Sequence, residues 1–252
     1  MRFISGTWLS LVLVLGVLVA PSGAAEVPPT TPTKPVPTVV ETKTIGTTVK
    51  GRAIRAYRIG EPTSPRKVVL LSTMHGDERG TAKILMNLVK GSPVTGADIW
   101  VIPYLNRDGY ARDTRKNARG VDLNRNFPTS WKRQGGKYYS GRKKASEPET
   151  RALMRFLDNV DPNFVVSLHQ PLRGVDISSG KTRSLGLRLA KGLGLPRKTF
   201  RCNTGCHGTM TQWFNKHHRG AALTVEYGAK VSRKQYRVTG PKGLLAAVFA
   251  TR

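Results

Sequence analysis

A buried strand that ends just before two candidate metal ligands constrains the fold of this chain more than any other feature of its sequence. The apolar residues 68–71 (VVLL) are followed by His75-Gly76-Asp77-Glu78. Such a run is typical of a parallel strand that is buried on both faces, and ligand sites in open α/β sheets form beyond the carboxyl ends of strands. A histidine and a carboxylate three positions apart on a helical turn have Cβ atoms about 5–6 Å apart. We therefore expect His75 and Glu78 to reach one metal ion.

Polar residues at two further strand ends extend this pattern. His169 follows the apolar residues 164–168, and Glu226 follows residues 221–225 (AALTV). Two histidines and one carboxylate are a common ligand set for a catalytic zinc ion that keeps its fourth position for water. The remaining carboxylate is suited to take a proton from that water. Each residue by itself also agrees with a structural role, as a solvated side chain, a hydrogen-bonded core histidine or a buried, paired carboxylate.

Strands alternate with helices along the rest of the chain. The patterns predict a hairpin at 43–49 and 52–59, strands at 67–73, 97–104, 163–168 and 221–226, and helices at 78–89, 146–159, 185–192, 209–217 and 242–250. For the helix at 146–159 we expect Ser146 as the N-cap and Glu149 in the capping-box position. Residues 109–145 form a long polar segment of the kind that carries function. The alternation predicts a single α/β/α sandwich domain with a mixed, largely parallel central sheet.

The first 25 residues have the pattern of a signal peptide rather than of a fold. Arg2 precedes the apolar residues 8–20, and the small residues 22–25 predict cleavage after Ala24 or Ala25. Residues 26–40 form a Pro/Thr-rich linker, and residues 41–252 form the catalytic domain. We expect an exported monomer with no stable membrane span after cleavage, because the apolar stretch is shorter than the ~20 residues of a span. A retained N-terminal anchor is the alternative.

The net charge of +27 bears on the partners of this chain. Basic residues gather at 112–119 and 132–144, as they do in proteins that neutralise phosphates. Aromatic residues are only 7%, without a stacking motif, and export argues against nucleic acid. The charge is better explained by work beside an anionic surface, such as bacterial cell-wall polymers. A solvated, solubilising surface is the alternative.

The only two cysteines lie four positions apart. Cys202 and Cys206 suit a disulfide in an exported protein, which would fix a local loop. The neighbouring His207 raises a Cys/His metal site as an alternative, but such a site would lack a fourth ligand.

Several motifs in one order resemble a known family. The chain resembles the zinc carboxypeptidase family of metallopeptidases over residues 44–250. The matching segments are MHGDE (74–78), NRDG (106–109), TRKNARGVDLNRNFP (114–128), SEPET (146–150), SLHQP (167–171) and TVEYG (224–228). The resemblance implies the same fold and one zinc ion per chain, bound by His75, Glu78 and His169.

The resemblance also implies roles for four other residues. Glu226 would be the general base and later the proton donor. Arg115 would polarise the scissile carbonyl and stabilise the oxyanion. Asn124 and Arg125 would hold the terminal carboxylate of the substrate, for which the planar guanidinium is suited.

One departure from the family concerns a mobile tyrosine that digestive members carry upstream of the base. The corresponding residues 202–207 contain no tyrosine, so Asn203, Thr204 or His207 would substitute, or the role is absent. The specificity pocket would lie around residues 209–211. None of these is acidic, so a preference for C-terminal Lys or Arg is not indicated.

The segments look most like the bacterial murein-peptide branch of the family. That branch cuts the amide between γ-D-glutamate and meso-diaminopimelate, a substrate with several carboxylates that agrees with a basic site and export. The alternatives are a carboxypeptidase that releases C-terminal L-amino acids and a non-catalytic, cationic protein that binds cell wall or other polyanions.

Overall fold

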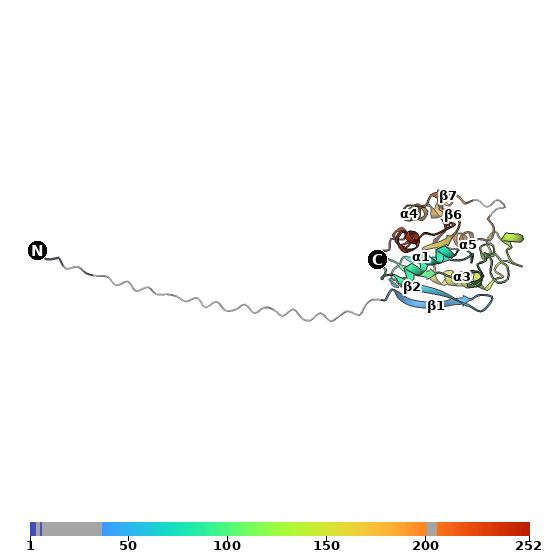
Figure 1. The fold of residues 1–252 in the computed structure, drawn as a ribbon, viewed down its shortest axis with the longest axis horizontal. Coiled ribbons are helices and arrows are strands. Elements are labelled where there is room, and N and C mark those ends of the chain that lie inside the picture. Colours follow the sequence, from blue (N-terminus) through green and yellow to red (C-terminus); the bar gives the residue numbers. More distant parts are fainter. Residues whose placement is uncertain (4–5, 7–36, 201–205) are drawn as a thin grey trace. The chain divides into compact units, whose positions relative to one another are not determined.

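An eight-stranded mixed sheet forms the centre of this protein in a computed structural model, which describes residues 1–3, 6, 37–200 and 206–252. The strand order is β1-β2-β4-β3-β5-β8-β6-β7, and Figure 1 shows β1 and β7 at opposite ends of the domain. The expected signal peptide (1–25) and most of the expected linker (26–40) lie outside the described residues. Residues 36–252 form one compact unit.

The observed elements agree with the predicted alternation. The strands are β1 (Val39–Thr47), β2 (Ala53–Gly60), β3 (Lys67–Ser72), β4 (Asp98–Ile102), β5 (Phe164–His169), β6 (Leu172–Asp176), β7 (Arg197–Lys198) and β8 (Ala221–Gly228). The α-helices are α1 (Arg79–Lys90), α2 (Arg107–Arg112), α3 (Pro148–Val160), α4 (Arg183–Leu193), α5 (Met210–His217) and α6 (Gly240–Ala247). The sequence patterns missed β6, β7 and α2, which are short and have no clear periodicity.

Helices cover both faces of the sheet, so the predicted three-layer sandwich is confirmed. Alternate residues of β3 point to opposite sides, because successive side chains of a strand alternate. Val68 and Leu70 pack with α1, α4 and α6, whereas Val69 and Leu71 pack with α3 and α5. Apolar side chains thus pack on both faces of β3, which explains why its sequence is a continuous hydrophobic run.

The parallel centre of the sheet brings the candidate site residues to one edge. β3 pairs in parallel with β4 and β5, and β5 pairs in parallel with β8. This register places His169 directly opposite Glu226. Because the carboxyl ends of these strands coincide, the residues that follow β3 come to the same edge.

A buried polar cluster fixes the long segment between β4 and α3, which the sequence left without structure. Besides α2, the segment contains two 3₁₀ helices, Leu123–Arg125 and Gly136–Tyr138. The side chain of Asn117 accepts hydrogen bonds from the backbone N–H groups of Arg119 and Val121 (3.0 and 3.1 Å). It also donates to Glu147 (2.7 Å) and Glu149 (3.1 Å). The segment is therefore anchored to the start of α3 by side chains rather than by strand pairing.

The predicted capping box at the start of α3 is wrong. The N-cap is Glu147, without a side-chain capping bond. The Ser146 hydroxyl donates instead to Glu147 (2.7 Å), and Glu149 accepts from the backbone N–H of Val49 in the β1–β2 turn (3.1 Å). Tertiary partners thus replace the local capping bonds. In the described part of the chain, no helix is long and apolar enough to cross a membrane.

We expect Asn117→Ala to lower the free energy of unfolding by about 2–3 kcal/mol, because two buried carboxylates lose a donor. Urea unfolding followed by circular dichroism measures this change. Lys83→Ala on the exposed side of α1 is the control and should change stability by less than about 0.5 kcal/mol. Equal, small effects of both substitutions would contradict this account of the loop.

Candidate metal centre and substrate-binding site

Three of the predicted site residues form one buried cluster at the carboxyl ends of β3 and β5. The Nδ1 atoms of His75 and His169 lie 3.3 Å apart. Nδ1 of His75 is 2.7 Å from one carboxylate oxygen of Glu78, and Nδ1 of His169 is 2.8 Å from the other. All three side chains are buried, and they are the one group within the described ranges that could hold a metal ion.

The geometry of this cluster agrees with zinc. Two nitrogens bound at about 2.0–2.1 Å to a tetrahedral zinc ion lie about 3.3 Å apart, which is the separation of the two Nδ1 atoms. Both histidines present the same ring nitrogen, and the carboxylate of Glu78 faces both of them. The donor set of two imidazoles and one carboxylate also leaves a coordination position for water.

The second ring nitrogen of each histidine has its own partner. Nε2 of His75 lies 3.1 Å from Oδ1 of Asp122, and Nε2 of His169 lies 2.9 Å from Oγ of Ser167. Such partners fix the orientation of a metal-binding imidazole and raise its basicity. Both histidines are therefore held with Nδ1 directed into the cluster.

Electrostatic interactions link the three side chains of the cluster and Asp122. Burial opposes charge on His75, but the carboxylates of Glu78 and Asp122 outweigh it and raise the His75 pKa to about 9. Burial likewise opposes charge on Glu78, but His75 and His169 lower its pKa to about 2. The carboxylates thus remain negative in this pocket, as binding of a divalent cation requires.

Arg115 is attached to the metal cluster through Asp122. Its Nε and Nη2 atoms donate to Oδ2 of Asp122 (3.0 and 2.8 Å), and Nη1 lies 3.9 Å from Glu78. The backbone carbonyl of Arg115 accepts hydrogen bonds from Gly76 N–H (3.3 Å) and from the side chain of Asn106 (3.2 Å). The guanidinium is half-buried beside the proposed ligands, where it can meet a substrate oxygen.

A glycine is required at position 76 because two motifs meet there backbone to backbone. A Cβ atom on Gly76 would lie 2.1 Å from the carbonyl carbon of Gly109. The motifs MHGDE and NRDG, far apart in the sequence, therefore pack directly against each other. This contact brings the segment that carries Arg115 to the metal ligands.

Glu226 lies next to His169 on the neighbouring strand. Residues in register on adjacent strands are about 4.8 Å apart and share a face of the sheet, and Glu226 is in register with His169. Its Oε2 accepts a hydrogen bond from Leu172 N–H (3.2 Å). Burial raises the pKa of Glu226, a change that makes a carboxylate a better proton acceptor.

Asn124 and Arg125 lie on the 3₁₀ helix that follows Asp122. The Asn124 side chain accepts a hydrogen bond from Met210 N–H at the start of α5 (3.0 Å), and Nη1 of Arg125 donates to the Asn124 carbonyl (2.8 Å). Tyr138 lies beside both site arginines, with its ring centroid 5.1 Å from the guanidinium carbon of Arg125 and 5.6 Å from that of Arg115. The two arginines thus border one aromatic side chain.

The segment 202–207, which corresponds to the mobile tyrosine of other family members, is only partly described by the structure. Cys202, Asn203 and Thr204 lie outside the described residues, so the Cys202–Cys206 disulfide stays a prediction. In the expected specificity pocket, Thr209 is the N-cap of α5, and its hydroxyl accepts from Gln212 N–H (3.2 Å). That hydroxyl is therefore engaged in a helix cap.

Sequence reasoning missed Asp122, Ser167 and Tyr138. Asp122 stands within the quoted segment GVDLNRNFP and Ser167 within SLHQP, so their motifs were visible although their roles were not. Tyr138 lies in none of the quoted motifs, and the site arginines beside it, Arg115 and Arg125, are more than ten residues away in the sequence.

The comparison with known families decides the identity. The zinc carboxypeptidase family model matches residues 33–184. The chain belongs to the zinc carboxypeptidase family. Zinc is therefore the cofactor that the buried cluster fits, and the family is one of zinc-dependent peptidases.

Individual members of the family resemble the chain over different extents. Murein peptide amidase A of Escherichia coli (strain K12) is 32% identical over 145 residues, which are 52% of this chain and 59% of that protein. The chain thus matches about three-fifths of the length of this curated relative.

Solved structures extend the likeness to most of the fold. The murein-tripeptide amidase from Escherichia coli O157 superposes with a TM-score of 0.66 and 26% identity, covering 83% of this chain and 91% of that one. Carboxypeptidase A from Helicoverpa armigera has a TM-score of 0.70 and 19% identity, covering 84% and 69%. The second likeness shows the fold alone.

We expect Asp122→Asn to weaken zinc binding by about 10–100-fold, because His75 loses the negative partner that orients its ring. Competition with a chromophoric chelator measures the affinity. Asp113→Asn, an exposed aspartate 3.7 Å from Arg79, is the matched control. Unchanged zinc affinity in Asp122→Asn would contradict the role of this carboxylate.

Proposed function

We propose that this protein is an exported zinc metallopeptidase that hydrolyses the amide between γ-D-glutamate and meso-diaminopimelate in murein peptides. The observation that carries the enzymatic part is the buried cluster of His75, Glu78 and His169, with Glu226 in register beside it and Arg115 tied to it through Asp122. The substrate is supported by the likeness to two murein peptide amidases.

The roles of the site residues follow from their positions and chemistry. His75, Glu78 and His169 hold zinc, which when bound supplies activation of a water molecule and polarisation of a carbonyl. Glu226 accepts the proton of the attacking water and returns it to the leaving nitrogen. Arg115 donates hydrogen bonds to the carbonyl oxygen, where negative charge develops in the transition state.

Asn124 and Arg125 bind the free carboxylate of the C-terminal residue. A guanidinium binds a carboxylate in bidentate fashion, and Arg125 is buried at the end of the same segment that carries Arg115 and Asp122. This arrangement selects an amide next to a chain terminus. A carboxypeptidase acting on ordinary L-peptides uses the same chemistry and is the competing substrate class.

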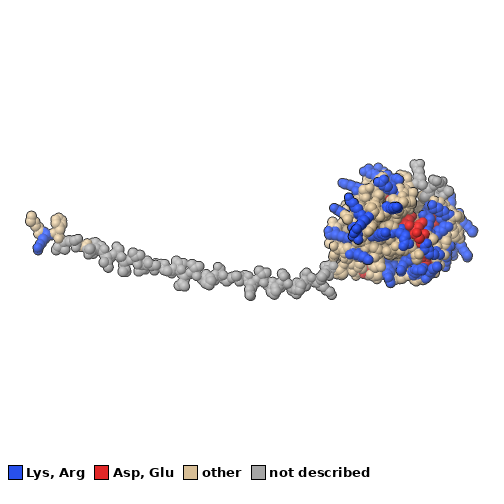
Figure 2. All heavy atoms as spheres, viewed as in Figure 1, with Lys and Arg blue, Asp and Glu red and all other residues tan. Residues whose placement is uncertain are grey.

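The charge distribution supports work on anionic material outside the cytoplasm. Among the described residues, seven acidic side chains are buried, whereas Arg125 is the one buried Lys or Arg; the acids are Glu78, Asp98, Asp108, Asp122, Glu147, Glu149 and Glu226. Figure 2 accordingly shows Lys and Arg over much of the visible face of the domain. Because the acids lie inside, the surface is more positive than composition alone indicates. Such a surface concentrates the protein at anionic cell-wall polymers.

We expect the protein to release diaminopimelate from L-Ala-γ-D-Glu-meso-diaminopimelate. Glu226→Gln should reduce kcat by about 10²–10⁴-fold, because the general base is lost, while zinc stays bound. Liquid chromatography measures the released diaminopimelate, and metal analysis measures the bound zinc. Glu61→Gln, an exposed glutamate, is the control and should retain activity.

The other outcomes separate the competing functions. Hydrolysis of blocked dipeptides ending in Phe, Leu, Lys or Glu, with no release of diaminopimelate, would replace the murein substrate by ordinary L-peptides. Bound zinc without turnover of any of these substrates would favour a cationic wall-binding protein.

We also propose that residues 1–25 direct export and that residues 26–40 are a linker. In a bacterial host, the secreted protein should begin at Ala25 or Glu26, as measured by N-terminal sequencing. Replacing Leu13 and Leu15 by Arg should abolish secretion because it interrupts the apolar region, whereas Thr31→Arg with Thr33→Arg in the linker should not. Secretion of the first double variant would contradict the proposal.

A further inference from the structure

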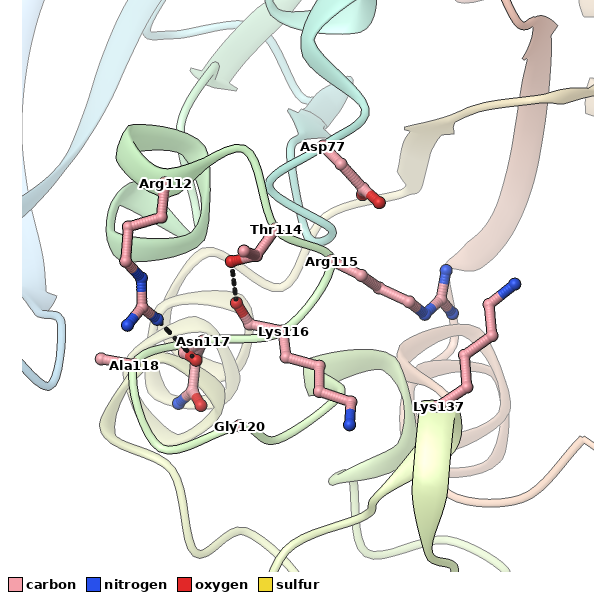
Figure 3. A pocket seen from close by; sticks show the side chains of 9 residues that line it. All are labelled: Asp77, Arg112, Thr114, Arg115, Lys116, Asn117, Ala118, Gly120 and Lys137. Carbon is pink, nitrogen blue, oxygen red and sulfur yellow. Dashed lines mark hydrogen bonds between the residues drawn. The ribbon is translucent and has the colours of Figure 1, made fainter.

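A basic hollow of about 470 Å³ opens beside Arg115. Apart from Arg115, its lining residues have no role in the proposed reaction. Four cationic side chains and one carboxylate line it, together with small and polar residues; the lining is Asp77, Arg112, Thr114, Arg115, Lys116, Asn117, Ala118, Gly120 and Lys137 (Figure 3). Arg115 is shared with the catalytic centre. Asn124 and Arg125 are not part of the lining, so the hollow lies apart from the residues proposed for the terminal carboxylate.

The positive charge of this hollow is largely uncompensated by protein carboxylates. Within the described residues, Arg112, Lys116 and Lys137 form no ion pair, and Arg115 pairs with Asp122 and, at 3.9 Å, with Glu78. Arg112 donates to the Asn117 carbonyl (3.0 Å). The one acid of the lining, Asp77, is exposed. Cations that lie together without acidic partners favour an anionic ligand.

The 3₁₀ helix Gly136–Tyr138 brings three of these cations together. Nζ of Lys116 donates to the Gly136 carbonyl, and Nζ of Lys137 lies 5.8 Å from the centroid of the Tyr138 ring. The guanidinium carbon of Arg115 lies 5.6 Å from the same centroid. In Figure 3 the side chains of Arg115 and Lys137 extend toward the same side. Lys137 is exposed, and among the described residues its ammonium group has only the contact with this ring, so its donors are available to a ligand.

The proposed substrate has an anionic group in the corresponding place. In a γ-linked glutamate the free α-carboxylate is separated from the scissile carbonyl by three carbon atoms, a reach of about 5 Å. Arg115 is proposed to bind that carbonyl oxygen and also lines the hollow, whereas Asn124 and Arg125, proposed for the terminal carboxylate of the leaving residue, are not part of the lining. With the carbonyl at Arg115, a reach of about 5 Å brings the α-carboxylate of the γ-glutamyl residue to the cations of the hollow.

We propose that this hollow is an anion subsite that binds the α-carboxylate of the γ-linked D-glutamyl residue and makes the enzyme selective for γ-glutamyl amides. The inference rests on the proposed function. Lys137 and Lys116 are the direct partners of the carboxylate, with Arg112 contributing to the local positive potential. An ordinary L-peptide has a backbone amide and a side chain at this position and gains no such contact unless that side chain is acidic.

A pair of substrates that differ in one charge tests the proposal. The wild-type protein is given L-Ala-γ-D-Glu-meso-diaminopimelate and its α-carboxamide analogue, in which D-isoglutamine replaces D-glutamate. We expect kcat/KM to be about tenfold higher for the carboxylate, as for the loss of a charge-assisted hydrogen bond. The preference should shrink as salt concentration rises, because the lysines are partly exposed.

Variants assign the effect to the hollow. Lys137→Gln should lower kcat/KM for the carboxylate substrate more than for the carboxamide, so that the ratio of the two falls from about ten toward one. Arg142→Gln, an exposed cation outside this hollow, is the matched control and should keep the ratio of the wild type. The comparison of the two substrates uses the wild-type protein, so the proposal can be tested even if a variant does not fold.

Two results would overturn the proposal in distinguishable ways. Equal kcat/KM for both substrates, or an unchanged ratio in Lys137→Gln, would overturn the subsite and leave the proposed function standing. Cleavage of neither murein tripeptide, with hydrolysis of blocked L-dipeptides, would overturn the proposed function and the subsite together.

Discussion

The buried carboxylate of Asp122 joins the metal cluster to the substrate-binding loop. One of its oxygens lies 3.1 Å from Nε2 of His75, and the other accepts two hydrogen bonds from Arg115. A buried charge is costly unless it is paired and hydrogen-bonded, so the carboxylate holds both partners in place. Burial opposes its ionisation, but His75 and Arg115 more than compensate and lower the Asp122 pKa. The orientation of the candidate zinc ligand His75 and the position of Arg115, the arginine proposed to bind the carbonyl, therefore depend on one side chain.

Backbone and side-chain hydrogen bonds hold the site together, although much of it lies outside regular helices and strands. Asp122 N–H donates to the Tyr139 carbonyl (2.8 Å), and the Asn126 side chain donates to the carbonyls of Ser140 (2.7 Å) and Lys143 (3.1 Å). Functional groups need such support to keep a productive geometry. The segment between β4 and α3 is thus a folded part of the domain that carries Arg115, Arg125 and most of the residues that line the basic hollow.

The burial of carboxylates and the exposure of cations connect this architecture to the proposed substrate. Buried carboxylates orient the ligands and anchor the loop, while the cations remain at the surface and around the hollow. The proposed murein peptide carries carboxylates on both sides of the scissile amide, so the same distribution would serve attraction at long range and recognition at short range.

The sequence by itself determined the elements and the reactive groups. The continuous apolar run of β3, the helical periodicity of α1 and the order of six motifs predicted the sandwich and brought His75, Glu78, His169 and Glu226 to strand ends. Only the tertiary structure decided which groups meet across the loop: Asp122 with His75, Tyr138 with Arg115 and Arg125, and Lys116 with the Gly136 carbonyl. It also overruled the capping box at Ser146, because Glu149 meets the hairpin instead. Local patterns encode periodicity and propensity, whereas these contacts arise from packing between segments distant in sequence.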